Sequence, residues 1–531
     1  MRRLSFAVAT LTAAALALLP AGIAAGHGDK LTARSADERT AAAAPLPFLT
    51  SDNVNFLANF PDTQMISGVH ARTGNFFYAS SLDSITVFDT SNPALPVPRG
   101  TIANLTFENE AITYGERREA NGKLVRFVLI GFDLYNVSPD PDHLNVLGRE
   151  LAIVDVTDPD NPFIRSSTPS RGQPGAVTTS THTVTCSNVI RCEWGYSAGS
   201  RGVASIIDLR DLDNPREVTT IKSPANGPNP VFRSGAGHRW DIDDAGYAFH
   251  TGSGGGALFK TLHRQGLPDL PKLVNATNAR GIESPFNDFI LHNSQRPNAK
   301  LFQANTTPSV FKGNVLIITE EDYFNDGEEA ICNQAGSIQT WYVPTLNKTG
   351  VSDTLPSTGN IRPLDIANIP AEGKAPLNEA GAFCSAHWFD FHQSGILAQG
   401  FYQQGLRFVN VRNPYDIKEY GFFTGGASEV WDAYWVPKRD ANGVATGKKT
   451  NIVYTADLVR GIDVFCVELP VSGAQKDCPT LPLGADGGKA TATASTGPVS
   501  GNFAAALPVL GLALVIGAAR RVRRRPDVTV G

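Results

Sequence analysis

Several features that are common in enzymes and in nucleic-acid-binding proteins are missing from this chain of 531 residues. It contains no CxxC and no HExxH motif, and its glycine-rich run at 252–257 lacks the Lys-Ser/Thr of a phosphate-binding loop. Charged residues make up only 18% of the chain, the formal net charge is −5, and no basic stripe is present. The sequence therefore gives no support to a metal–thiolate site or a P-loop enzyme, and it argues against nucleic acid as a partner.

The N-terminus is typical of a secretory signal peptide, which we place at residues 1–25. Arg2 and Arg3 precede a mainly apolar run, and small residues follow as far as Ala25. A basic start, an apolar centre and a small-residue cleavage region are the three parts of such a peptide. We expect cleavage near Ala25, and the alternative is an uncleaved membrane anchor.

The other end of the chain predicts a membrane anchor. Residues 503–519 are apolar, and five arginines follow within the tail 520–531, which predicts that this tail stays in the cytoplasm. The apolar stretch is short, since a bilayer core of about 30 Å needs about 20 helical residues. Residues 480–502, rich in Gly, Ala and Thr, predict a stalk, and residues 26–50 predict a flexible leader. We therefore expect a single-pass protein of the cell membrane with its main domain, 51–479, on the extracellular face.

The six cysteines predict disulfides, because an even number is expected in an exported chain that forms them. One pair flanks a short segment that can form a hairpin turn, and a second flanks a loop with Pro and Gly. The third pair follows by elimination. The predicted pairs are Cys186 with Cys192, Cys466 with Cys478, and Cys332 with Cys384.

A phrase recurs along the main domain: an apolar run, then Asp or Asn, then a turn that contains Asn-Pro. Its clearest copies read SITVFDTSNP, LAIVDVTDPDNP, ASIIDLRDLDNP and LRFVNVRNP, and they end at Pro93, Pro162, Pro215 and Pro414. The apolar runs are rich in β-branched residues, and proline ends them because it cannot donate to a β-ladder. A repeated phrase predicts an array of one supersecondary unit.

Weaker copies bring the number of units to seven, and each has room for about four short strands. The predicted fold is therefore all-β, a seven-bladed β-propeller. No outer strand follows the seventh copy, GIDVFC, whereas residues 53–60 look like the missing strand. An open sheet edge invites aggregation. We therefore predict that this N-terminal strand closes the ring.

The phrase resembles the repeat of the bacterial LVIVD-repeat β-propellers, in which a LxIxDVSNPxxPxxVG unit recurs. LAIVDVTDPDNPFI is similar to that unit, and the resemblance extends over residues 51–470. It implies the fold and leaves the function open. The chain is also similar to the copper-dependent selenium-binding proteins, the methanethiol oxidases, but only in the expected architecture and in its scattered histidines.

Histidines recur at one place in successive units, the start of the strand expected to lie innermost. These residues are His182, His238, His292 and His387, with Glu429 at a similar place in the seventh unit. Innermost strands surround the propeller axis, so equivalent positions converge there. Glu320 and Glu321 lie near a strand end in the fifth unit, and we expect Glu320 and Glu429 close to the histidines. Converging imidazoles predict a site for Cu, Zn or Fe. The alternative is that each histidine caps a strand or bonds a neighbouring blade.

Two functions fit these patterns. The first is a surface module that binds a surface protein, a polysaccharide or a small ligand, with a structural metal in the channel. The second is a metal-dependent enzyme, either an oxidoreductase of the copper type or a hydrolase, that uses the histidine cluster. An enzyme requires an open coordination position on the metal, whereas a binding module requires a broad face of loops.

Overall fold

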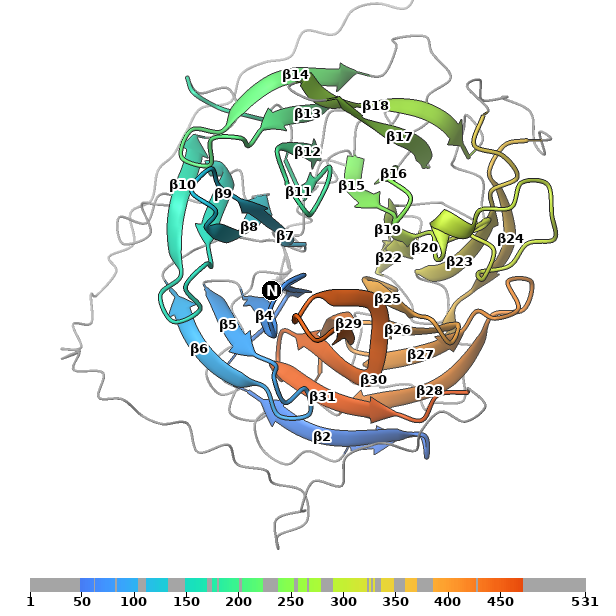
Figure 1. Cartoon of the computed structure of the whole chain (residues 1–531). Coiled ribbons are helices and arrows are strands. Elements are labelled where there is room, and N and C mark those ends of the chain that lie inside the picture. Colours follow the sequence, from blue (N-terminus) through green and yellow to red (C-terminus); the bar gives the residue numbers. More distant parts are fainter. Residues whose placement is uncertain are drawn as a thin grey trace, which may run out of the picture.

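Seven antiparallel sheets surround one axis, as Figure 1 shows. The structure, a computed structural model, describes residues 48–470 apart from 62, 82–83, 104–110, 132–148, 170–173, 179–180, 200–202, 223–236, 253–255, 265–266, 278–289, 322–323, 326–327, 330–335, 348–358, 370–384 and 426–427. The predicted signal peptide, stalk, anchor and tail lie outside these residues. In the part of the chain that is described, no helix is both long and apolar enough to cross a membrane.

The blades follow one another along the chain, with the first strand of each nearest the axis and the fourth at the rim (Figure 1). Blade 1 consists of β3 (Ser67–His70), β4 (Phe76–Ser80), β5 (Ile85–Asp89) and β6 (Val97–Ile102). Blade 2 consists of β7 (Thr113–Arg118), β8 (Leu124–Gly131), β9 (Arg149–Asp155) and β10 (Phe163–Pro169). Blade 3 consists of β11 (Thr183–Cys186), β12 (Trp194–Ala198), β13 (Val203–Asp208) and β14 (Arg216–Lys222). Blade 4 consists of β15 (Gly237–Ile242), β16 (Tyr247–Gly252), β17 (Ala257–Arg264) and β18 (Leu267–Ala276). Blade 5 consists of β19 (Ile290–Gln295), β20 (Val315–Glu321), β23 (Ser337–Tyr342) and β24 (Arg362–Ala367). Blade 6 consists of β25 (Phe389–His392), β26 (Ile396–Gly400), β27 (Leu406–Asn410) and β28 (Lys418–Gly425). Blade 7 consists of β29 (Val430–Arg439), β30 (Ala445–Asp457) and β31 (Ile462–Val467), with β2 (Val54–Phe60) as its rim strand. A small hairpin of β21 (Phe324–Asn325) and β22 (Glu328–Glu329) and the 3-10 turn η3 (Ala299–Leu301) belong to connections.

The seven-bladed all-β fold predicted from the phrase is confirmed, and the last blade contains strands from both ends of the domain. Strand β2 pairs antiparallel with β31, from Val54 opposite Val467 to Phe60 opposite Ile462. The N-terminal strand thus takes the place that the seventh unit leaves empty.

The first strand of the domain lies within the range predicted as a flexible leader. Strand β1 (Phe48–Thr50) pairs with β28 at the rim of blade 6, so the predicted leader 26–50 ends in a strand. Leu49 is 54% exposed, and Phe48 is also exposed. A short edge strand with exposed apolar residues has no alternating pattern by which the sequence could reveal it.

The recurring Asp or Asn of the phrase has a structural reason. The side chains of Asp89, Asp155, Asp208 and Asn410 each accept a hydrogen bond from the backbone N–H two residues later, at 2.8–3.1 Å. Such Asx turns redirect the chain after a strand. The phrase therefore corresponds to the third strand of a blade, the end of that strand and the turn to the rim strand.

The core lies between neighbouring blades, because each sheet presents both faces to another sheet. Ile206 on β13 packs with Trp240 and Phe259 of blade 4, while the next residue, Ile207, faces blade 2 beside Phe127. Third strands are therefore apolar on both faces, and this explains the near-continuous apolar runs of the phrase. Burying each such side chain contributes roughly 1.5–3 kcal/mol.

The predicted disulfide between Cys186 and Cys192 is present, with a Cα–Cα distance of 5.0 Å. It closes the turn between β11 and β12. Cys466 is also disulfide-bonded. Its predicted partner Cys478, like the predicted pair Cys332–Cys384, lies outside the described residues.

Candidate metal centre

Four histidines at or just before the innermost strands form a row, and we call them the histidine row. His182 directly precedes β11, His238 and His292 lie on β15 and β19, and His387 precedes β25. Successive ring centroids are 4.3, 4.1 and 4.0 Å apart, and all four side chains are buried. Four consecutive blades thus each supply one imidazole to the same place.

Backbone contacts orient His238 within the row. Its Nδ1 lies 3.0 Å from the carbonyl oxygen of His292. A carbonyl oxygen only accepts, so Nδ1 carries the proton of the neutral ring and Nε2 carries the lone pair. This Nε2 lies 2.9 Å from Nε2 of His182. Metal-binding histidines commonly have their second nitrogen held in this way.

His387 is oriented by a carboxylate as well as by the backbone. Its Nδ1 lies 2.9 Å from Oδ1 of Asp432 and 3.0 Å from the carbonyl oxygen of Trp431. Tyr434 donates its hydroxyl hydrogen to the other oxygen of Asp432. Burial, together with the Asp432 charge, raises the pKa of Tyr434 well above its usual value, so the phenol remains a donor. A carboxylate behind a histidine leaves Nε2 as the nitrogen with the lone pair.

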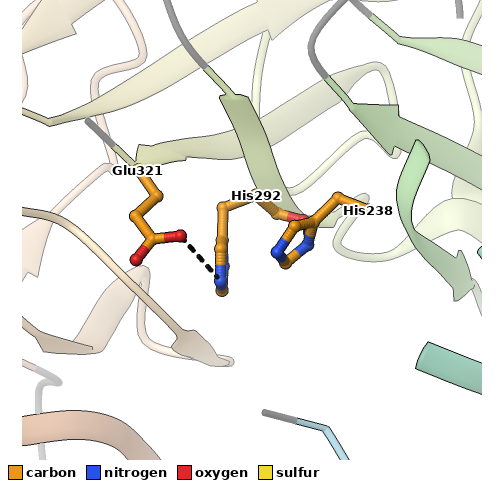
Figure 2. Close-up of side chains that lie close together, drawn as sticks. All are labelled: His238, His292 and Glu321. Atoms are coloured by element: carbon orange, nitrogen blue, oxygen red, sulfur yellow. Dashed lines mark hydrogen bonds and ion pairs between the residues drawn. The ribbon is translucent and has the colours of Figure 1, made fainter. Parts of the chain in front are cut away.

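Glu321 is the carboxylate that reaches the histidine row, and its neighbour Glu320 does not. Oε2 of Glu321 lies 3.7 Å from Nε2 of His292, and both side chains are buried (Figure 2). Glu320 instead accepts hydrogen bonds from Ser337 and Gln339 on β23 of its own blade, at 3.0 and 3.5 Å. Successive residues of a strand point to opposite faces, so only one of the two glutamates can face the row.

Glu429 contacts the tryptophan that packs against His387. Its Oε1 accepts the indole N–H of Trp431 at 3.0 Å, and its backbone N–H donates to Asp457 at 3.0 Å. The Trp431 ring lies 5.1 Å from that of His387. Glu429 therefore supports the surroundings of the row from blade 7.

Three residues bring their ligand atoms within 4.8 Å of one another: His238, His292 and Glu321. Figure 2 shows these side chains, which we call the ligand trio, turned toward a common region. Bonds from Zn to imidazole nitrogen are about 2.0–2.1 Å, so two ligands of one ion lie at most about 4.2 Å apart. The trio is therefore spaced on the scale of a metal site. In the residues that the structure describes, no other three His, Cys, Asp or Glu residues bring their ligand atoms within 4.8 Å of one another.

Tyr402, which no sequence pattern singled out, contacts the ligand trio from the loop between β26 and β27. Its hydroxyl donates to Glu321, and its ring lies 5.0 Å from that of His387. Its φ of 48° is in the left-handed region, which is strained for a tyrosine by about 1–3 kcal/mol. Two backbone hydrogen bonds with Val430, at 2.8 and 2.9 Å, hold it there. Nothing in the local sequence signals this conformation, because it is imposed by the neighbouring blade.

A buried ion pair lies one residue further along β15. Arg239 donates to Asp241 at 2.7 Å, and its guanidinium carbon lies 4.0 Å from the ring centroid of Trp388. Burial raises the pKa of Asp241 above its usual value, while Arg239 opposes that shift. The region next to the histidine row is therefore polar and electrically compensated.

The segment 195–199 reads GYSAG and fits the GxSxG pattern of serine hydrolases. In those enzymes the serine lies on a sharp turn between a strand and a helix, where it is exposed. Here Ser197 is fully buried within β12, and its Oγ accepts the backbone N–H of Ser205 at 2.9 Å. The match is therefore a coincidence of sequence.

No family model matches the chain, and no curated protein matches it. Among solved structures, the β-propeller domain of Cps50 (Swd1) from Myceliophteria thermophila is similar, with 10% identity, 78% of this chain and 100% of that chain covered, and a TM-score of 0.43. The WD40 β-propeller domain of Doa1 is similar with 9% identity, 79% and 98% covered, and a TM-score of 0.38. Likenesses of this size say nothing about the site.

Proposed function

We propose that this chain is an exported propeller that binds one divalent transition metal through the ligand trio, His238, His292 and Glu321. The observation that carries this proposal is the approach of their three buried ligand atoms to within 4.8 Å of one another. Two imidazoles and one carboxylate suit Zn²⁺, Fe²⁺ or Cu²⁺ better than Ca²⁺ or Mg²⁺.

The surroundings of the trio support the proposal. The backbone carbonyl that holds Nδ1 of His238 leaves Nε2 as its metal-binding nitrogen. Tyr402 donates to one oxygen of Glu321, while the other oxygen faces His292. A buried carboxylate facing a neutral imidazole is costly unless charge compensates it, and a cation at this point would do so.

We assign the metal a structural place in a surface binding module, in line with the LVIVD-like repeat. The partner would be a surface protein, a polysaccharide or a small ligand. The residue patterns of 1–25 and 503–519 support export and anchoring, with the propeller on the extracellular face of the cell membrane.

A metal-dependent enzyme is the second candidate, and the number of ligands favours it. Structural zinc sites have four protein ligands, whereas catalytic sites have three and keep a position for water or substrate. The trio supplies three. The phenol of Tyr402 donates to Glu321, so the trio also has a proton donor in contact with one of its ligands. An oxidoreductase of the copper type or a hydrolase is therefore the alternative to a binding module.

Metal analysis of the purified full-length protein tests the proposal. We expect about one equivalent of Zn, Cu or Fe in the wild type, and a loss of that metal in His238→Ala, His292→Ala and Glu321→Gln. His392→Gln is the matched control, because this buried histidine contacts Ser394 and Lys449 rather than the row. A wild type that carries no metal, and takes up none from Zn²⁺, Cu²⁺ or Fe²⁺, would refute it.

A further inference from the structure

The short contact between His182 and His238 determines which atom holds a proton in the metal-free protein. Their Nε2 atoms lie 2.9 Å apart, so one must donate and the other accept. Nδ1 of His238 already donates to the carbonyl of His292. In the neutral ring Nε2 of His238 therefore accepts, and His182 donates its Nε2–H.

That hydrogen bond competes with metal binding. An imidazole nitrogen has a single lone pair, which cannot accept a hydrogen bond and bind an ion at the same time. Nδ1 of His238 is engaged with the backbone, so Nε2 is the nitrogen that can ligate. Any ion bound by the ligand trio must first displace the N–H of His182.

We propose that His182 is a competing hydrogen-bond donor that protects the metal-binding nitrogen of His238 and lowers the affinity of the site for its metal. This inference rests on the proposed metal-binding function. It assigns His182 a regulatory role in the site, in contrast to the ligand role predicted from its position in the repeat.

Distances argue against His182 as a fourth ligand of the same ion. Its nitrogens do not join His238, His292 and Glu321 within 4.8 Å, although all four residues are described. Ligands of one ion lie at most about 4.2 Å apart. The next residue holds the chain in place, because Thr183 donates to the carbonyl of His238 at 2.7 Å. The contact of His182 with His238 is therefore that of a hydrogen-bond partner and not of a fellow ligand.

Substitutions at His182 separate the two roles. Phenylalanine keeps a ring against His238, where the centroids are 4.3 Å apart, but has no donor. Glutamine keeps an N–H donor. If His182 competes, His182→Phe should bind metal about threefold to tenfold more tightly, which corresponds to the net strength of one hydrogen bond. His182→Gln should stay within about twofold of the wild type.

The experiment measures the affinity of the purified full-length protein for Zn²⁺ by competition with a chelating indicator at pH 7.5. His238→Ala serves as the variant that loses a ligand, and His182→Leu replaces His182→Phe if the latter does not fold. Weaker or unchanged binding in the donor-free variant, with a wild type that binds Zn²⁺, would overturn the role of His182 alone. If the wild type binds no Zn²⁺, the same titration is made with Cu²⁺ and Fe²⁺. A wild type that binds none of the three would overturn the proposed function and this inference with it.

Discussion

At the scale of single residues, burial keeps His392 neutral. Its Nδ1 accepts the backbone N–H of Ser394 at 3.0 Å, and its Nε2 lies 3.3 Å from the carbonyl oxygen of Lys449. Burial lowers the pKa of His392 to about 4. This residue joins blade 6 to the long β29–β30 hairpin of blade 7.

We therefore expect His392 to make the protein sensitive to acid. His392 takes up a proton near pH 6.5 in the unfolded chain but only near pH 4 in the folded chain. The free energy of unfolding therefore decreases as the pH falls between these values. The full decrease in the free energy of unfolding is roughly 3 kcal/mol. In His392→Gln the melting temperature should fall less between pH 7 and pH 4 than in the wild type. Parallel pH profiles of the two proteins, measured by circular dichroism, would contradict this assignment.

We expect Tyr402 to tune the proposed metal site without being required for folding. In Tyr402→Phe, Glu321 loses the hydrogen bond that fixes its orientation, and loss of such a contact typically weakens metal binding about 10- to 100-fold. Tyr420→Phe is the control, because that hydroxyl donates to the carbonyl of Glu468 on the rim. Equal Zn²⁺ affinities of the two variants would show that Tyr402 does not act on the site.

The histidines of the site could be predicted from sequence, whereas its carboxylate and phenol could not. His182, His238, His292 and His387 share one position in the repeat, and the ring brings such positions together. Glu320 and Glu321 are adjacent, and a shift of one residue in a strand exchanges the faces. Tyr402 depends on backbone pairing with blade 7, to which no local pattern refers.

At the scale of elements, arginines on the rim strands join neighbouring blades. Arg165 on β10 pairs with both oxygens of Asp213, in the Asn-Pro turn of blade 3, at 2.7 and 3.1 Å. Arg99 on β6 does the same with Asp160 of blade 2, at 2.7 and 2.8 Å. The Asn-Pro turn of the phrase thus leads to the rim strand of its own blade. It also carries the aspartate that accepts hydrogen bonds from the arginine of the preceding blade.

Removing one of these contacts should lower stability measurably. In Arg165→Gln, the pair with Asp213 is lost and Asp155, at 3.6 Å, loses a nearby cation. We expect a decrease of about 1 kcal/mol, which shrinks at high salt. Arg216→Gln is the matched control, since the Arg216 side chain is 73% exposed and its ion pair, at 3.4 Å, is with Asp208 of its own blade. If thermal unfolding shows that both variants lose the same stability, the contact between blades contributes nothing.

At the scale of the whole molecule, ring closure depends on one strand. Strand β2 pairs with β31 and buries Val54, Ala58 and Phe60. The sequence predicted this strand because the seventh unit lacks a rim strand of its own. It did not predict β1, since three residues with an exposed Leu49 carry no period.

Truncation should distinguish the two N-terminal strands. A mature chain that begins at residue 51 lacks β1 and should fold with a melting temperature close to that of the wild type. A chain that begins at residue 61 also lacks β2, which exposes the edge of β31, so we expect aggregation or a melting temperature lower by more than about 10 °C. Similar stabilities of the two chains would show that β2 does not close the ring.

The metal centre is tested most directly by anomalous X-ray scattering from crystals of the full-length protein loaded with Zn²⁺. We predict one strong anomalous peak about 2.0–2.2 Å from Nε2 of His238, a ring nitrogen of His292 and an oxygen of Glu321. His182 should then be turned away from His238. The absence of a peak at the ligand trio, or a peak held by other residues, would contradict the proposed site.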